Sequence, residues 1–134
     1  MENIAEQFGR NAGEVWKTLN TLGPLPETKL KETTKLQDDE FYAAIGWLAR
    51  ENKINKTGAI YKLGETNLTQ KIGADAGKLW TMLNKSGRID VYDLSHELQL
   101  DERDIYLALG WLARENKIEP KKSIPKDYQV KTWQ

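Results

Sequence analysis

The chain has 134 residues, its twenty basic side chains are balanced by twenty acidic ones, and 39% of its residues are apolar. This composition indicates a globular protein of one ordinary domain or two very small ones, and the balanced charge excludes an overall field that would draw the whole molecule onto nucleic acid or anionic lipid. Because the sequence has no cysteine and no apolar run near the roughly 18 residues of a membrane span, we expect no disulfides, no membrane partner and no secretory leader, and the cytoplasm is the expected compartment.

Three helices are predicted in the first half of the chain. Apolar residues recur at helical spacing over residues 12–22, and Gly23 and Pro24 end this first helix. A short second helix is predicted over about 27–35, and a third helix begins near Gln37. The predicted core face of the third helix consists of Phe41, Ala44, Ile45 and Leu48.

A β-hairpin is predicted after the third helix. The stretch KINKTGAIYKL contains two short β-prone runs around Gly58, which would supply the positive φ of the turn. Asn52, at the end of the third helix, is predicted to be a left-handed cap. Three helices followed by a two-stranded flap indicate a winged helix-turn-helix.

The second half of the chain repeats the first. When the sequence is displaced by 64 positions, residues 8–54 align with residues 72–118 without a gap, and 20 of these 47 pairs are identical. The nine letters GWLARENKI occur unchanged at 46–54 and at 110–118.

We therefore predict a mainly α fold with small β-hairpin wings, arranged as a tandem winged helix-turn-helix. The first copy is predicted to span residues 1–66 and the second copy residues 67–134. The segment that joins them, 64–68, is too short to let the copies separate widely.

The pattern AG-x-x-W-x-x-L followed by Y-x-A-x-GWLARENKI resembles a small bacterial and archaeal winged helix-turn-helix family of unknown function, whose signature is an ALGWLARE-type third helix. In the first copy the residues 12–19 and 44–51 carry the pattern, and residues 76–83 and 108–115 carry it in the second. The resemblance implies the fold but brings no activity with it. Winged helices include DNA-binding transcription regulators and protein-interaction modules, so the fold alone does not decide the function.

Gly46 and Gly110 lie inside the third helix of each copy. Glycine costs a helix about 1 kcal/mol relative to alanine, so each is predicted to lie where a methyl group would collide with a neighbour. The predicted neighbour is the first helix, whose small residues Ala12 and Gly13 would allow a close approach. The alternative is the close approach of a binding partner.

The outer face of each third helix is unusually apolar for a surface that reads DNA. Such a surface is normally polar and basic, so that it can hydrogen-bond base edges. The residues of this face are Tyr42, Gly46, Trp47 and Arg50 in the first copy, and Tyr106, Leu107, Gly110, Trp111 and Arg114 in the second. We predict that this face binds protein: the other copy, a second chain or another partner. The alternative is that each tryptophan folds beneath its own wing and Arg50 pairs with a nearby carboxylate.

Acidic residues stand at the start of each third helix, where a recognition helix first meets DNA. They are Asp38, Asp39 and Glu40, and Asp101, Glu102 and Asp104. They would repel phosphates, although acids in a first helical turn also complement the helix dipole. Either interpretation makes this a poor base-reading site.

The wings are basic, and they indicate an alternative function: the protein would be a DNA-binding regulator whose wing lysines contact phosphates without reading sequence. The candidate phosphate contacts are Lys53, Lys56, Lys62, Lys117, Lys121, Lys122 and Lys126. Lysines also keep edge strands soluble, which is the structural interpretation of the same residues.

No enzyme is predicted. The single histidine, His96, has no metal-ligand neighbours in the sequence, and no nucleophile has a base to activate it. The stretches GRNAG and GADAG lack the strand and lysine of a phosphate-binding loop and are interpreted as helix entry and packing. We expect no cofactor, no metal and no small-molecule substrate.

Overall fold

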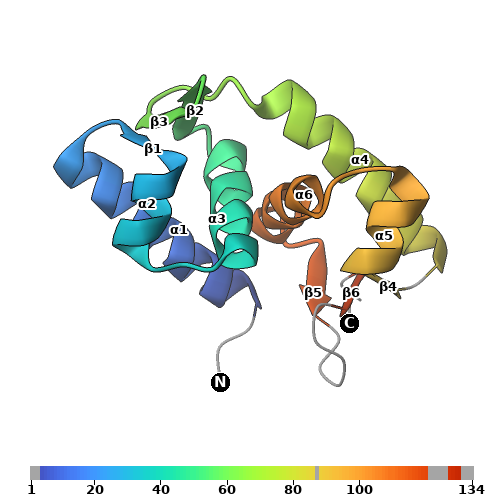
Figure 1. Cartoon of the computed structure of the whole chain (residues 1–134). Helices are drawn as coiled ribbons and strands as arrows, with labels where there is room; N and C mark the ends of the chain where they lie inside the picture. The colour runs from blue at the N-terminus through green and yellow to red at the C-terminus, as the bar shows by residue number, and fades with distance from the viewer. Residues whose placement is uncertain (1–3, 87, 121–126, 131–134) are drawn as a thin grey trace.

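The computed structural model describes residues 4–86, 88–120 and 127–130, and it contains the same winged unit twice (Figure 1). The elements of the first copy are α1 (Ile4–Leu22), β1 (Leu25–Pro26), α2 (Glu27–Thr34), α3 (Asp38–Arg50), β2 (Ile54–Thr57) and β3 (Ile60–Leu63). Those of the second copy are α4 (Thr69–Ser86), β4 (Arg88–Asp90), α5 (Val91–Leu98), α6 (Glu102–Arg114), β5 (Ile118–Pro120) and β6 (Asp127–Val130). The predicted mainly α fold with small β wings is confirmed.

Each wing has one strand more than predicted. In the first copy β1 comes from the connection between α1 and α2 and pairs with β3, which gives the antiparallel order β1-β3-β2. The second copy repeats this arrangement as β4-β6-β5. A strand of two residues that ends in proline leaves no period-two pattern in the sequence, so β1 could not be predicted from it.

The residues predicted to end the helices do so. Gly23 has a φ of +80°, and Asn52 and Asn116 have φ values of 59° and 61°, in the left-handed region that suits a cap. The side chain of Asn52 also accepts a hydrogen bond of 2.9 Å from the backbone N–H of Thr66, which fixes the inter-copy segment to the end of α3.

The first helix begins earlier than predicted. Helix α1 starts at Ile4, so the stretch GRNAG lies in its middle, and GADAG likewise lies inside α4. The prediction that these stretches form helix entries was therefore wrong. No described helix is long and apolar enough to cross a membrane.

The predicted core faces of the third helices are buried. Phe41, Ile45 and Leu48 are at most 2% exposed, and they pack with apolar residues of α1, α2 and β2. The second copy buries the equivalent residues, Ile105, Ala108, Leu109 and Leu112. Full burial stabilises a large apolar side chain by about 1.5–3 kcal/mol.

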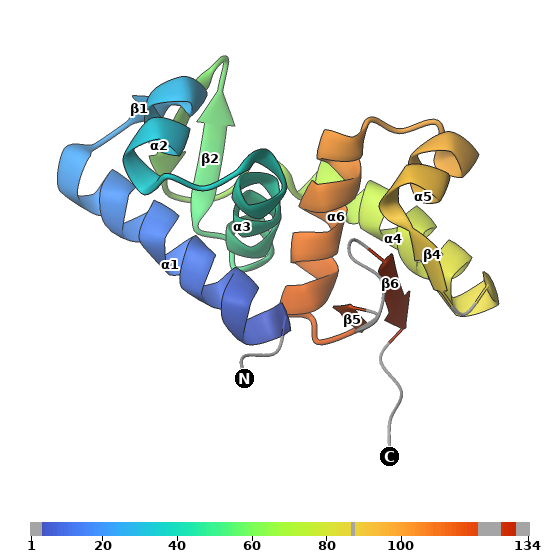
Figure 2. The ribbon, with the colours of Figure 1, turned by 60° about the horizontal axis from the view of Figure 1, so that its bottom comes forward.

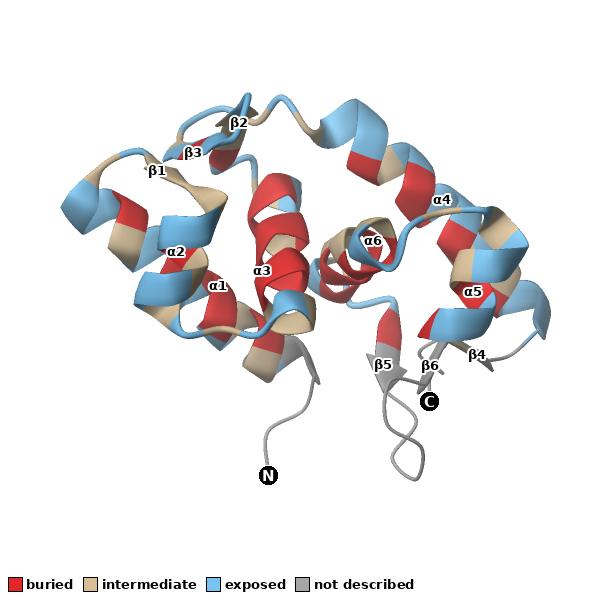
Figure 3. Cartoon of the chain, viewed as in Figure 1, coloured by how far each residue is buried: buried red, intermediate tan, exposed pale blue. Residues whose placement is uncertain are grey.

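Helices α3 and α6 pack against each other in the centre of the molecule. Figure 2 shows them side by side, with the wing of one copy at one end and the wing of the other copy at the opposite end. Buried residues follow one another along α3 from Phe41 to Gly46, so α3 is covered on its outer face as well as on its core face (Figure 3). A helix that is apolar all round belongs in the interior of a protein, and here the second copy supplies the cover.

Candidate functional site

The centre of the contact between α3 and α6 is a pair of glycines. A Cβ atom added to Gly46 would lie 1.9 Å from the carbonyl oxygen of Leu107, and a Cβ atom added to Gly110 would lie 1.9 Å from the carbonyl oxygen of Ala43. Both distances fall far inside van der Waals contact, and the atoms approached are backbone atoms that cannot rotate away. The two backbones therefore meet at a distance that only glycine permits at both positions.

The prediction that these glycines pack against the small pair of the first helix was wrong. A Cβ atom built on Gly13 or Gly77 meets nothing within 4 Å, and both of these glycines are exposed. The physical reason is that the close neighbour of each third helix is the other third helix. The alternative was the close approach of a binding partner, and the surface that approaches each glycine belongs to the other copy of the same chain.

Arginine and glutamate are exchanged between the copies at the ends of the two helices. Arg50 Nε donates a hydrogen bond of 3.0 Å to Glu115, and Arg114 Nε donates one of 2.9 Å to Glu51. Arg50 corresponds to Arg114 in the repeat, and Glu51 corresponds to Glu115, so the contact is the same in both directions. Such reciprocity defines an isologous, approximately twofold interface.

Each indole lies between its own first helix and the arginine of the other copy. The ring of Trp47 lies against Gly9 of α1, where an added Cβ would be 3.1 Å from the ring, and the guanidinium of Arg114 is 5.7 Å from the indole. Trp111, Gly73 and Arg50 repeat the arrangement, with the same 5.7 Å separation.

The tryptophans are thus half-buried at the interface between the copies, and not beneath the wings as the alternative prediction had it. Arg50 does pair with a carboxylate, as that alternative proposed, but the carboxylate comes from the other copy. The unchanged segment GWLARENK therefore supplies the glycine, indole, arginine and glutamate of both halves of one interface.

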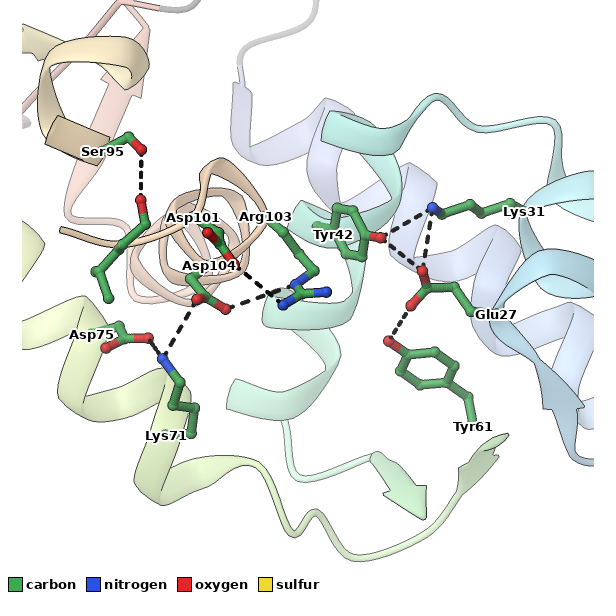
Figure 4. Close-up of polar contacts among 11 residues, drawn as sticks. Glu27, Lys31, Tyr42, Tyr61, Lys71, Asp75, Ser95, Asp101, Arg103 and Asp104 are labelled. Carbon is green, nitrogen blue, oxygen red and sulfur yellow. Dashed lines mark hydrogen bonds and ion pairs between the residues drawn. The ribbon is translucent and has the colours of Figure 1, made fainter. Parts of the chain in front are cut away.

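Tyr42 forms a hydrogen-bond network within the first copy (Figure 4). Its hydroxyl donates a hydrogen bond of 2.7 Å to Glu27, which also accepts one of 2.9 Å from Tyr61. Lys31 Nζ donates to the Tyr42 hydroxyl at 3.1 Å and pairs with Asp38 at 3.1 Å. Burial raises the pKa of Glu27, but the hydrogen bonds from Tyr42, Tyr61 and Lys31 outweigh burial and hold this pKa below its ordinary value of 4.5.

Tyr106, the equivalent residue of the second copy, has lost this network. Val91 and Ser95 occupy the positions of Glu27 and Lys31, and the Ser95 hydroxyl donates instead to the backbone carbonyl of Leu100. The Tyr106 side chain is 6% exposed, and its hydroxyl has no hydrogen-bond partner among the described residues. Burial, followed by the nearby carboxylates of Asp39 and Glu102, raises the pKa of Tyr106 to about 12, so the hydroxyl stays protonated at neutral pH.

The two tyrosines line a cleft of about 610 Å³ between the starts of α3 and α6. Its lining consists of Gln37, Asp38, Asp39, Tyr42, Asp101, Glu102, Arg103 and Tyr106. Most of the acids that the sequence places at the helix starts thus face one space. We name this space the acidic cleft.

Two of the lysines predicted to contact phosphates form ion pairs within the chain. Lys53 pairs with Glu51 at 3.6 Å and Lys117 with Glu115 at 3.5 Å, so both neutralise carboxylates of the interface. Lys56 lies 5.6 Å from the ring of Tyr61, and Lys62 is exposed. The other three, Lys121, Lys122 and Lys126, lie outside the described residues.

The one histidine makes an aromatic ring contact. His96 is exposed and packs edge-on against Tyr92, with 4.5 Å between the ring centroids. Across residues 4–86, 88–120 and 127–130, no group of three or more histidine, cysteine, aspartate or glutamate side chains is placed to hold a metal ion.

The fold and this interface define a class: two winged helix-turn-helix units in one chain, joined through their third helices. A known family, described as Winged helix-turn-helix domain (DUF2582), matches residues 1–63 and again residues 66–129, and the chain belongs to that family. The resemblance inferred from the third-helix signature is confirmed. Comparison with curated proteins gives no match, and neither does comparison with solved structures.

Proposed function

We propose that this chain is a non-catalytic protein-interaction module in which the two third helices bind each other and do not read DNA. One observation carries the proposal: Gly46 and Gly110 bring the outer faces of α3 and α6 into backbone contact. A winged helix that reads sequence inserts that face into the major groove. In this arrangement neither face is free to do so.

The charge around the third helices supports the same proposal. DNA affinity depends on cations placed against phosphates. The first turns of α3 and α6, which would meet DNA first, carry Asp38, Asp39, Glu102 and Asp104. The arginines of the outer faces, Arg50 and Arg114, are hydrogen-bonded to carboxylates across the interface.

The proposal assigns the module a scaffold role. A rigid, fused pair of units holds its remaining surface in a fixed geometry, which lowers the entropy lost when a protein partner binds. We place the module in the cytoplasm, because a sequence with no cysteine suits a reducing compartment. We assign it no catalytic role, because the sequence gives no nucleophile a base to activate it and its single histidine, His96, is exposed.

The second candidate is a phosphate-binding role for the wings, and the exposed Lys62 favours it. A wing that binds phosphates without a recognition helix would bind DNA weakly and with little sequence preference. This candidate is compatible with the closed α3–α6 interface. The experiment below therefore separates it from the main proposal.

The test is fluorescence anisotropy with a labelled random-sequence duplex and with fragmented genomic DNA, at salt concentrations from about 50 to 200 mM. We expect no complex tighter than the non-specific range of about 10⁻⁴ to 10⁻⁶ M, and no preferred fragment. A nanomolar, sequence-specific complex that is weakened by Trp47→Ser and Arg50→Ser would contradict the proposal.

Two triple variants test the wings in the same assay. Lys56→Glu, Lys121→Glu and Lys122→Glu remove wing cations, and the matched control Lys17→Glu, Lys29→Glu and Lys78→Glu makes the same charge change on helices. We expect both variants to weaken any residual binding equally. Loss of salt-sensitive binding in the wing variant alone would support the phosphate-binding candidate.

A further inference from the structure

A small pocket lies where the first wing meets the second copy. It has a volume of about 180 Å³ and lies between α3, the wing strands β2 and β3, and the N-terminal turns of α4 and α6. Its walls are apolar and aromatic side chains: Ile45, Leu68, Ile72, Leu107, Tyr42 and Tyr61. We name this space the junction pocket, because both copies contribute to it.

Three cations from three elements line the junction pocket: Lys56 of β2, Lys71 of α4 and Arg103 of α6. Among the described lining residues, Asp104 is the one carboxylate. Lys71 pairs with Asp104 and with Asp75, so its charge is neutralised within the fold. Lys56 and Arg103 remain, and a pocket with apolar walls and two such cations suits a ligand that has an apolar body and a negatively charged group.

The position of Lys56 is fixed by the segment that joins the copies. The backbone N–H of Lys56 donates a hydrogen bond of 3.0 Å to the side chain of Asn67, and the amide of Asn67 donates one of 2.7 Å to the carbonyl of Lys56. The ammonium group lies 5.6 Å from the centre of the Tyr61 ring and forms no ion pair in the described part of the chain. Its charge is therefore available to a ligand.

Arg103 also has donors that a ligand can use. Its guanidinium carries several N–H groups, and its ion pairs with Asp101 at 3.5 Å and with Asp104 at 4.0 Å are too long for strong hydrogen bonds. Figure 4 shows the side chain reaching from α6 towards Tyr42, which forms part of the pocket wall. An anion in the pocket would therefore meet Arg103 from the second copy and Lys56 from the first.

The equivalent place on the other side of the α3–α6 contact lacks all three cations. After displacement by 64 residues, they correspond to one proline, one glutamine and one aspartate: Pro120, Gln7 and Asp39. The winged fold and the interface form on that side without a cation. The cations of the junction pocket are therefore not required by the fold or the interface, and a bound anion accounts for them.

We propose that the junction pocket binds a small aromatic carboxylate, as a ligand and not as a substrate. The ring lies among the apolar walls, and the carboxylate accepts hydrogen bonds from Lys56 and Arg103. An apolar cavity of about 150 Å³ is large enough for benzene. The junction pocket, at about 180 Å³, therefore has room for one ring and its carboxylate. A guanidinium suits this group because it can donate two parallel hydrogen bonds to a carboxylate.

The ligand would contact both copies at once. Because Lys56 belongs to the first copy and Arg103 to the second, a bound carboxylate links the two and stabilises the α3–α6 arrangement by mass action. The inference goes beyond the proposed function, which needs no small molecule.

The test is calorimetric titration of the full chain with benzoate at low salt. We expect saturable binding of one benzoate per chain, with a dissociation constant at or below about 1 mM. Benzamide, which lacks the charge, and acetate, which lacks the ring, should each bind at least about tenfold more weakly. No saturable binding of benzoate would overturn the inference, and so would equal binding of benzamide, acetate or inorganic phosphate.

Three variants locate the site. We expect Lys56→Gln and Arg103→Gln each to weaken benzoate binding about tenfold. The matched control is Lys62→Gln, which removes a lysine of the same wing that does not line the pocket, and it should leave the affinity unchanged. Melting curves without benzoate check that each variant is folded. Equal weakening by Lys62→Gln, or unchanged binding in both pocket variants, would overturn the assignment.

Amide spectra of the labelled chain provide a second measurement. Benzoate should shift the resonances of Lys56, Leu68 and Ile72 and leave those of α5, which lies outside the pocket, unchanged. Shifts confined to α5 would contradict the proposed site.

The outcome is separable from that of the DNA experiment. If benzoate does not bind and DNA is not read, the proposed function stands while the carboxylate ligand falls. If sequence-specific DNA binding is found, the proposed function falls whatever benzoate does.

Discussion

In the first copy the third-helix tyrosine, Tyr42, is hydrogen-bonded to Glu27 and Lys31, whereas in the second copy the equivalent hydroxyl of Tyr106 has no partner in the part of the chain that the structure describes. At the interface between the copies the contacts are equivalent: Gly46 packs against the backbone of α6, and Gly110 packs against the backbone of α3. The duplication has thus kept the glycine, tryptophan, arginine and glutamate of the shared interface and changed several residues around the acidic cleft. The two copies share their fold and their interface. A function specific to one copy would therefore depend on the positions at which the copies differ.

The largest expected effect comes from breaking the shared interface. Gly46→Ala together with Gly110→Ala places a methyl group on a backbone carbonyl at both crossings, and overpacking of this kind costs about 1–3 kcal/mol per site. We expect the free energy of unfolding to fall by about 2–6 kcal/mol in urea denaturation, with the two copies no longer unfolding as one unit.

The matched control uses the other helical glycines. Gly13→Ala and Gly77→Ala place the same methyl group in open space, so each is expected to raise the free energy of unfolding by about 0.5–1 kcal/mol. Equal behaviour of the two pairs would show that α3 and α6 do not meet at the glycines.

The next effect tests the network that only the first copy has. Glu27→Gln removes a carboxylate that accepts hydrogen bonds from two tyrosines and pairs with Lys31, and is expected to cost about 1–3 kcal/mol in thermal or urea unfolding. The exposed substitution Glu32→Gln on the same helix should change stability by less than about 0.5 kcal/mol. Similar losses of stability in both variants would show that the hydrogen bonds of Glu27 do not stabilise the fold.

The same carboxylate gives a pH dependence whose sign is fixed. The pKa of Glu27 is lower in the folded protein than its ordinary value of 4.5, so its contribution is fully present above that value and is lost as the pH falls through the folded pKa. We expect the wild type to lose more stability than Glu27→Gln between pH 6 and the acid range, as measured by urea unfolding at a series of pH values. Parallel curves would contradict the lowered pKa.

A smaller effect compares the two tyrosines directly. Tyr42→Phe removes a hydroxyl that makes two hydrogen bonds and should cost about 1–2 kcal/mol. Tyr106→Phe removes an unpaired buried hydroxyl and should be neutral or stabilising. Melting curves of the two variants decide the matter, and an equal loss in both would mean that Tyr106 has a partner within the chain.

The smallest effect tests reciprocity. Arg50→Ala and Arg114→Ala each remove one half-exposed ion pair and one indole contact, together worth about 0.5–1 kcal/mol. Because the contacts are equivalent, the two losses should agree within error in chemical denaturation. A clear inequality would show that the interface is not isologous.

The fold could be predicted from the sequence because its signals are local. Helical spacing, the glycine and proline after the first helix, and the asparagine caps at Asn52 and Asn116 all act within a few residues of where they stand. The repeat strengthened these predictions, because the same signals occur at equivalent positions in both copies. Strands β1 and β4 lack such a signal, and only pairing with β3 and β6 makes them strands.

The site could be predicted only in part, because its contacts are tertiary. The apolar outer faces of the third helices were visible in the sequence, but the neighbour of Gly46 was not, since Ala12 and Gly13 offered an equally small surface. The unpaired Tyr106 depends on which residues face it across α5 and α6. Comparing the copies position by position would have revealed it, because a glutamate and a lysine in the first copy become Val91 and Ser95 in the second.

The most direct test of the account is to detect the contact between α3 and α6 in solution. In a nuclear Overhauser experiment on the labelled full chain, the Cα protons of Gly110 should give cross-peaks to the Cα proton of Ala43, and those of Gly46 to the amide proton of Trp111. Presence of both sets is the predicted result. Their absence, in a sample that still shows the contact between Gly9 and the ring of Trp47 within one copy, would contradict the account.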